Sequence, residues 1–233
     1  MNKHLRAIVF LAALAILTAA VVAGTLSEYI TKENKKDSAT VTKFGVVLRI
    51  SDESAFETKY NSPDGSEVTV ASTAETVAPG TNDNGGVLIT ITGTPDVKTV
   101  TRFKLKVNSD IFLKTGTDAY YYPLVFTFSQ VGDASGDITP VVLKTGTLRE
   151  VADWLENEFP NTDAAENAPG TNLKSTYRLS WTWVFEESEQ IDEYDTALGD
   201  LAAGVADGEG LISGVDYSVT VKYALTVTVA QSN

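Results

Sequence analysis

The residue types on which most enzymes depend are scarce in this chain. Its 233 residues include no cysteine, and His4 is the only histidine. Serine and cysteine triads, zinc sites with nitrogen or sulfur ligands and the His-Glu-x-x-His helix all need those side chains. Glycoside hydrolysis needs only two facing carboxylates, but the acidic residues lie in expected loops and on strand exteriors. We therefore expect no catalytic residues and no enzymatic activity.

Carboxylates gather in the segment Glu186–Thr196, with Asp200 shortly after it. Oxygen ligands of this kind suit Ca²⁺, as do those of Asn82–Asn84. Neither segment has the Asp-x-Asp-x-Asp-Gly spacing of an EF-hand. The simpler interpretation of both is a solvated loop. We expect no cofactor, with calcium in the acidic loops as the alternative.

Two tryptophans, Trp181 and Trp183, are two residues apart, so a strand would place both side chains on one face. An exposed pair would form a carbohydrate-binding platform, whereas a buried pair would belong to a core. The apolar neighbours Leu179 and Phe185 favour the core.

The N-terminal residues have the pattern of an export signal. Lys3 and Arg6 precede an apolar block over Ala7–Gly24, and small residues follow. Small-x-small sites at residues 21–23 and 25–27 could be cut. The block also approaches the roughly 20 residues that span a bilayer. We expect a signal peptide over residues 1–27 and secretion, with a retained anchor as the alternative.

The charge of the chain limits its partners. There are 18 Lys and Arg against 31 Asp and Glu, which gives a net charge of −13. Residues 1–27 hold two basic residues and no acidic one, so their removal brings the net charge to −15. Because an acidic surface repels phosphate groups, we expect no nucleic-acid partner.

Strand patterns dominate the chain from Ala39 onward. Alternating or continuous apolar residues predict strands over residues 41–50, 67–70, 87–93, 97–108, 120–128, 177–186 and 215–229. Thr147–Glu150 is a capping box, and the apolar spacing after it predicts one helix that ends at Pro160. These elements predict a mainly β protein, a single β-sandwich domain over residues 39–233 with one inserted helix.

Short motifs occur in order along nearly the whole chain, at Gly24–Thr31, Ser38–Leu48, Ala78–Thr81, Ile91–Val97, Trp181–Phe185 and Asp195–Gly199. In this order they resemble the TasA/camelysin family of exported bacterial biofilm-fibre proteins. The chain departs from the family pattern at Ser27-Glu28, where a more apolar pair is usual, and at Lys43–Gly45.

The resemblance implies a jelly-roll-like antiparallel sandwich whose subunits polymerise head to tail by donor-strand complementation. It also implies a dedicated signal peptidase that cuts after Ser27. Camelysin has been labelled a metallopeptidase, but the lack of histidine beyond His4 sets that activity aside here. The expected partners are other copies of this chain, the signal peptidase and other components of an extracellular matrix.

An extended N-terminal arm over residues 28–38 suits that mechanism. The segment Glu28–Asp37 is too polar to fold alone, yet it is long enough to pair along a sheet edge. The residues expected to make the assembly contact are Glu28, Tyr29, Ile30, Thr31 and Lys32. The alternatives are a disordered tail, a cell-surface adhesin or carbohydrate-binding module that uses the two tryptophans and the tyrosine run at residues 120–122, and a pilin-like subunit that retains its apolar helix.

Overall fold

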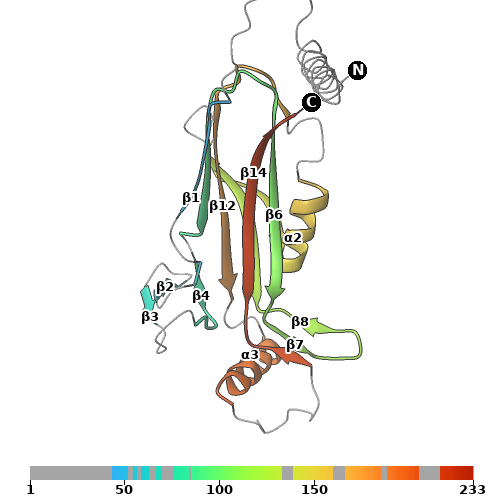
Figure 1. Ribbon diagram of the computed structural model, residues 1–233. Coiled ribbons are helices and arrows are strands. Elements are labelled where there is room, and N and C mark those ends of the chain that lie inside the picture. The colour runs from blue at the N-terminus through green and yellow to red at the C-terminus, as the bar shows by residue number, and fades with distance from the viewer. Residues whose placement is uncertain are drawn as a thin grey trace, which may run out of the picture. The chain divides into compact units, whose positions relative to one another are not determined.

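The structure is a computed structural model that describes residues 44–51, 55–56, 59–62, 67–69, 76–83, 85–132, 139–159, 166–184, 188–204 and 216–232. All of them belong to one compact unit, residues 42–233. The predicted signal peptide and the predicted arm lie outside the described residues. The predicted fold class is confirmed, since the described residues form a mainly β, antiparallel sandwich (Figure 1).

The sandwich consists of a larger and a smaller sheet. In the larger sheet the neighbouring strands are, in order, β1 (Val46–Ile50), β5 (Val87–Gly93), β12 (Leu173–Trp183), β9 (Leu124–Gly132) and β10 (Val141–Gly146). The end of β12 also pairs with β4 (Thr81–Asn82), to which β2 (Lys59–Asn61) and then β3 (Glu67–Thr69) are joined. The smaller sheet has the order β11 (Glu166–Asn167), β6 (Thr99–Ser109), β14 (Lys222–Gln231).

A third, short sheet extends beyond one end of the sandwich. It has the order β13 (Tyr217–Ser218), β7 (Phe112–Lys114), β8 (Tyr120–Tyr121). The helix α3 (Glu189–Ala202) lies at the same end (Figure 1).

Aromatic side chains join the two main sheets. Phe103 of β6 packs edge-on against Phe128 of β9 at 5.3 Å between ring centroids, and against Tyr177 of β12 at 5.1 Å. The alternation that predicted these strands decides which side chains meet, because successive strand residues point to opposite faces. Phe103 and Leu105 are buried while Lys104 and Lys106 are exposed, as predicted.

The predicted helix is α2 (Leu148–Asn157), and its capping box is confirmed. Glu150 donates its backbone N–H to the Thr147 hydroxyl at 3.3 Å, while the Glu150 carboxylate accepts from the Thr147 N–H at 2.8 Å. Buried side chains of α2 contact β6 of one sheet and β9 and β10 of the other. The helix therefore closes one side of the sandwich.

A second helix occupies a segment that the sequence analysis interpreted as an acidic loop. The loop interpretation of Glu186–Thr196 is wrong for its described part, because α3 begins at Glu189. Ser188 caps the helix by accepting the Ile191 N–H at 3.3 Å. Acidic side chains obscured a helical apolar spacing of Ile191, Tyr194, Leu198 and Leu201.

Two of the predicted strands are interrupted. The segment 215–229 was expected to be one strand, but residues 219–221 separate β13 from β14. Residues 122–123 likewise separate β8 from β9, and Pro123 lacks the backbone N–H that a continuous ladder would need.

Candidate assembly surface

The strand β1 forms one edge of the larger sheet. Among the described residues it pairs only with β5, and Leu48 lies opposite Ile91 while Ile50 lies opposite Ile89. Directly opposed residues of an antiparallel pair point to the same face of the sheet. Ile91 is 3% exposed and Ile89 is 0% exposed, whereas Leu48 is 37% and Ile50 is 40% exposed. The inner face of the sheet is therefore uncovered at its β1 edge.

The strand β14 forms an edge of the smaller sheet. Within the described part of the chain it pairs only with β6. Leu225 lies opposite the buried Leu105, so it points inward, and it remains half-buried. Tyr223 and Val229 alternate with it on the same inner face and are also half-buried.

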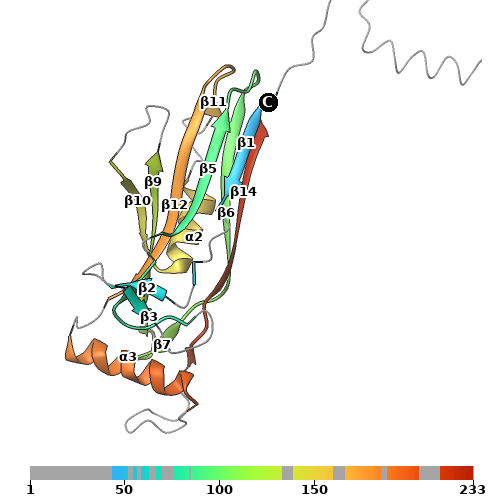
Figure 2. The ribbon, with the colours of Figure 1, turned by 90° about the vertical axis from the view of Figure 1, so that its left-hand side faces the viewer.

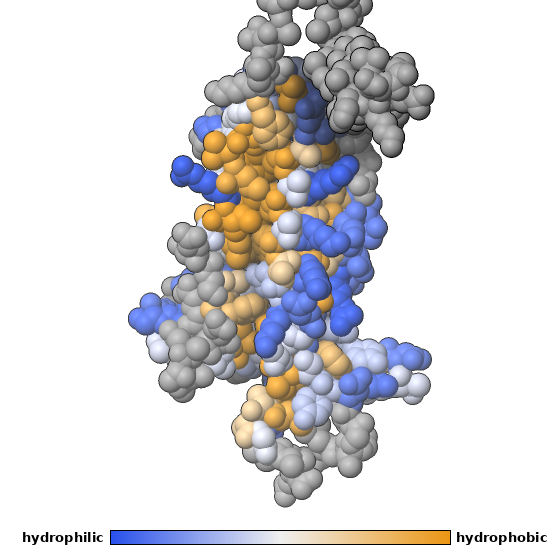
Figure 3. Space-filling view, in the orientation of Figure 1, coloured by the Kyte–Doolittle hydropathy of each residue, from blue (hydrophilic) through white to orange (hydrophobic). Residues whose placement is uncertain are grey.

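The edges β1 and β14 lie on the same side of the sandwich (Figures 1 and 2). A band of hydrophobic residues is exposed on this side in the upper half of Figure 3. We call the inner-face residues of the two strands the edge stripe: Leu48, Ile50, Tyr223, Leu225, Val227 and Val229. The opposite side is the one that α2 closes, so the core is covered by a helix on one side and partly open on the other.

A close approach between two glycines positions β1. A Cβ built on Gly93 would overlap the carbonyl oxygen of Gly45. Both residues have positive φ, 137° at Gly93 and 55° at Gly45, which glycine adopts without a steric penalty. This contact lies at the point where Val46 pairs with Gly93 and β1 begins.

At the other end of the edge stripe, Tyr223 joins it to the core. Its ring packs edge-on against Phe56 at 6.0 Å and against Phe126 at 6.2 Å. Burial raises the pKa of the Tyr223 hydroxyl well above its usual value, and the nearby Asp83 carboxylate raises it further. Tyr223 is therefore uncharged at every physiological pH.

The predicted assembly residues Glu28, Tyr29, Ile30, Thr31 and Lys32, and the predicted cleavage site at Ser27, lie outside the described residues. What the structure adds is the edge stripe, which the sequence analysis did not identify. A signal was present in β1, where Val46, Val47, Leu48 and Ile50 make nearly every position apolar. A strand covered on one face only would alternate more cleanly.

The tryptophan pair does not form a surface platform. Trp181 is 2% exposed and Trp183 is 5% exposed. The indole N–H of Trp181 donates to the Ala55 carbonyl at 2.7 Å, and that of Trp183 donates to Asp195 Oδ1 at 3.0 Å. The interpretation of the tryptophan pair as core is confirmed, so the pair itself offers no exposed platform for a carbohydrate.

The acidic segments bring no metal site together in the part of the chain that is described, where no group of three or more His, Cys, Asp or Glu side chains could hold an ion. In the segment Asn82–Asn84, Asp83 Oδ1 instead accepts the Gly86 N–H at 2.7 Å and so closes a turn. In the described residues there is also no helix with the length and hydropathy to cross a membrane.

Comparison with protein-family models, with curated proteins and with solved structures finds no match for this chain.

Proposed function

We propose that this protein is a secreted structural subunit of an extracellular, biofilm-matrix fibre. In this proposal cleavage after Ser27 frees the arm of one copy, and the arm pairs along the edge stripe of the next copy. The observation that carries the proposal is the exposure of Leu48 and Ile50, 37% and 40%, on a face where their opposite residues are buried.

Strand addition suits this surface for three physical reasons. An edge strand carries backbone N–H and C=O groups that an extended peptide can pair with. The ten residues of Glu28–Asp37 span about 33 Å when extended, and the ten residues of β14 span the same length. Covering the exposed parts of Leu48 and Ile50 contributes about 1 kcal/mol each.

Because every copy would carry both an arm and an edge stripe, pairing would continue from copy to copy, and we propose an open filament over a closed ring. Other copies of the chain would be the principal partners, together with the signal peptidase and other matrix components. No reaction is part of this function.

The absence of cysteine makes a direct test possible. Two single-cysteine variants, Ile30→Cys and Leu48→Cys, are mixed and oxidised. We expect a disulfide-linked heterodimer if the arm of one copy reaches β1 of another. Thr226→Cys is the matched control, since Thr226 lies on the outer face of β14 and is exposed. Equal cross-linking of Ile30→Cys to both positions would contradict the proposed contact. Repeating the test with Tyr29→Cys and Thr31→Cys allows for the register of the arm.

A deletion tests whether the arm is needed. We expect the variant that lacks residues 28–37 to remain soluble, while the processed protein forms filaments in electron microscopy. If the deletion variant formed the same filaments, the donor-arm mechanism would be wrong. N-terminal sequencing of the native protein identifies the cleavage site and separates this function from a pilin-like filament that retains residues 7–24.

A further inference from the structure

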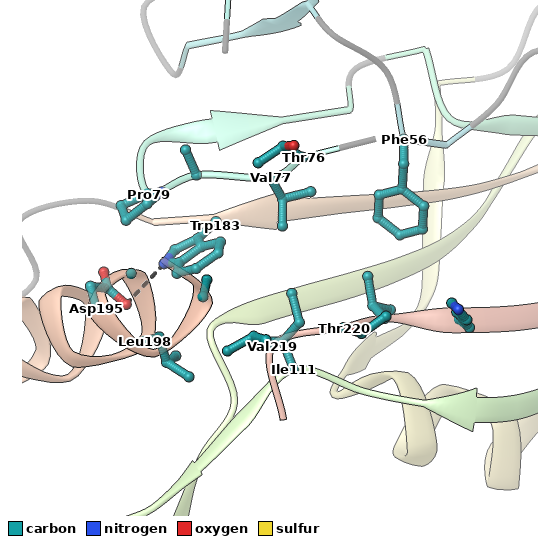
Figure 4. Close-up of a pocket in the computed structure, with 15 residues that line it drawn as sticks. Phe56, Thr76, Val77, Pro79, Ile111, Trp183, Asp195, Leu198, Val219 and Thr220 are labelled. Carbon is teal, nitrogen blue, oxygen red and sulfur yellow. Dashed lines mark hydrogen bonds between the residues drawn. The ribbon is translucent and has the colours of Figure 1, made fainter. Parts of the chain in front are cut away.

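A cavity of about 490 Å³ lies at the end of the sandwich that carries α3 (Figure 4). Its walls come from parts of the chain that are far apart in sequence, including Phe56, residues 76–79, Ile111, the end of β12, α3 and residues 219–222. In Figure 4 the side chains of Val77 and Val219 approach the cavity from opposite sides. Mainly apolar pockets of roughly 300–1,000 Å³ are the usual sites for small ligands.

One wall of the cavity is held rigidly. The Trp183 indole N–H donates to Asp195 Oδ1 at 3.0 Å, and the Tyr121 hydroxyl donates to the same oxygen at 2.6 Å. The dashed line in Figure 4 marks the first of these bonds. The two donors come from β12 and β8, so they fix α3 against two sheets and leave the indole in one orientation.

The cavity has unoccupied space beside α3. Gly199 lines the cavity at an exposed position of α3, and a Cβ built on it would have no atom within 4 Å, so the cavity is open to solvent at this point. The neighbouring Leu198 is 2% exposed and Ile111 is 4% exposed, so their packing is already complete. A ligand that covers the apolar walls of the cavity would remove that surface from water, which is favourable.

The charged residues around the cavity indicate where a charged group of the ligand would lie. Asp195 is 6% exposed, and its carboxylate would repel an anionic group that entered deeply. Lys222 and Thr220 also line the cavity but are exposed, so they lie at its rim. A cation and a hydroxyl at the rim suit an anionic head group, while the apolar walls suit a hydrocarbon tail.

We propose that this cavity binds a small anionic amphiphile of the medium-chain carboxylate class. The tail lies against Val77, Trp183 and Val219, and the carboxylate lies at the rim beside Lys222. This site adjoins the Tyr223 end of the edge stripe, because Phe56 lines the cavity and packs against Tyr223, but it does not depend on fibre assembly.

Equilibrium dialysis of the full chain against labelled octanoate tests the proposal, because it measures binding to single copies and to filaments alike. We expect saturable binding of one octanoate per chain. Affinity should rise roughly fourfold for each methylene from hexanoate to decanoate, as the tail displaces water from apolar walls. No saturable binding, or affinity that does not change with chain length, would overturn the proposal.

Substitutions at Gly199 locate the site. We expect Gly199→Leu to obstruct the opening of the cavity and weaken octanoate binding by at least about tenfold, and Gly199→Ala to retain binding as the matched control. Equal binding by both variants contradicts the proposed location.

A substitution of Lys222, at the rim of the cavity, tests the position of the head group. Lys222 is exposed, so its substitution should leave folding intact. We expect Lys222→Gln to weaken octanoate by about two- to fivefold and to leave octanol unchanged. If both ligands weakened equally, or neither did, the carboxylate would not lie beside Lys222.

Discussion

Leu48 and Ile91 lie directly opposite each other in the β1–β5 pair, yet Leu48 is 37% exposed and Ile91 is 3% exposed. The two side chains share the inner face of one sheet. The difference in exposure arises because, among the described strands, the smaller sheet ends at β14 and does not extend over β1. Leu48 is therefore a residue whose burial a second copy of the chain could complete.

Substitution of Leu48 should affect assembly more than folding. The variant Leu48→Thr introduces a β-branched residue that suits a strand, and it should lower the free energy of unfolding of the single subunit by about 1 kcal/mol. In the proposed assembly the same substitution also removes about 1 kcal/mol from each contact between copies. The critical concentration for filament formation should therefore rise about fivefold. Light scattering against concentration measures that value.

Val47→Thr is the matched control for this substitution. Val47 neighbours Leu48 on β1, points to the opposite face and is 49% exposed. We expect its critical concentration to match that of the unsubstituted protein. If Val47→Thr and Leu48→Thr shifted the critical concentration equally, the inner face of β1 would not be the contact surface.

Gly93→Ala should detach the start of β1. The new Cβ would overlap the Gly45 carbonyl oxygen, and alanine at a φ of 137° is strained in addition. Amide hydrogen exchange should show faster exchange in β1, while exchange in β12 stays slow. Gly170→Ala is a useful comparison, because Gly170 has a φ of 78° but no atom within 4 Å of a built Cβ. Equal loss of protection in β1 in the two variants would contradict the role given to the Gly45–Gly93 contact.

Asp110 should make stability depend on pH. Its side chain is 3% exposed, and burial raises its pKa from 3.8 to about 6, an increase that the Ile111 N–H and the Arg149 charge only partly oppose. A raised pKa means that the folded state binds the proton more tightly than the unfolded state. The resulting stabilisation is fully present below pH 3.8 and is lost as the pH rises through about 6.

The variant Asp110→Asn isolates this contribution, because asparagine can still accept the Ile111 N–H, which lies 3.0 Å from Asp110 Oδ1. We expect the variant to be more stable than the unsubstituted protein at pH 7, by up to about 3 kcal/mol, and equally stable near pH 4. Urea denaturation at both pH values measures the difference. A difference that did not change with pH would show that Asp110 titrates normally.

Asp195 should be the most sensitive acidic residue of α3. Replacement by alanine leaves the Trp183 and Tyr121 donors without their buried acceptor, so Asp195→Ala should lower the free energy of unfolding by about 2–5 kcal/mol. Tyr121→Phe removes one donor only and should cost about 1 kcal/mol. Urea denaturation followed by tryptophan fluorescence measures both.

Glu193→Ala, at an exposed position of the same helix, is the control and should change the free energy of unfolding by less than about 0.5 kcal/mol. Similar losses for Asp195→Ala and Glu193→Ala would contradict the buried role of Asp195.

Local patterns in the sequence determined the elements that depend on neighbouring residues. The alternation of Phe103 and Leu105 with lysines predicted β6 and the face that it buries. The capping box of Thr147 and Glu150 predicted where α2 begins. Both signals succeed because strand alternation and helix capping are set by residues within a few positions of each other.

The tertiary structure alone decided which strands are edges and which side chains meet. Leu48 and Ile91 both lie in strand patterns with apolar residues two positions away, and the extent of the facing sheet makes one exposed and the other buried. The acceptor shared by Trp183 and Tyr121 lies in α3, a helix whose apolar spacing is hidden among carboxylates. These two contacts join residues that are 12 and 74 positions apart, and they follow from strand pairing and sheet packing, which no local periodicity encodes.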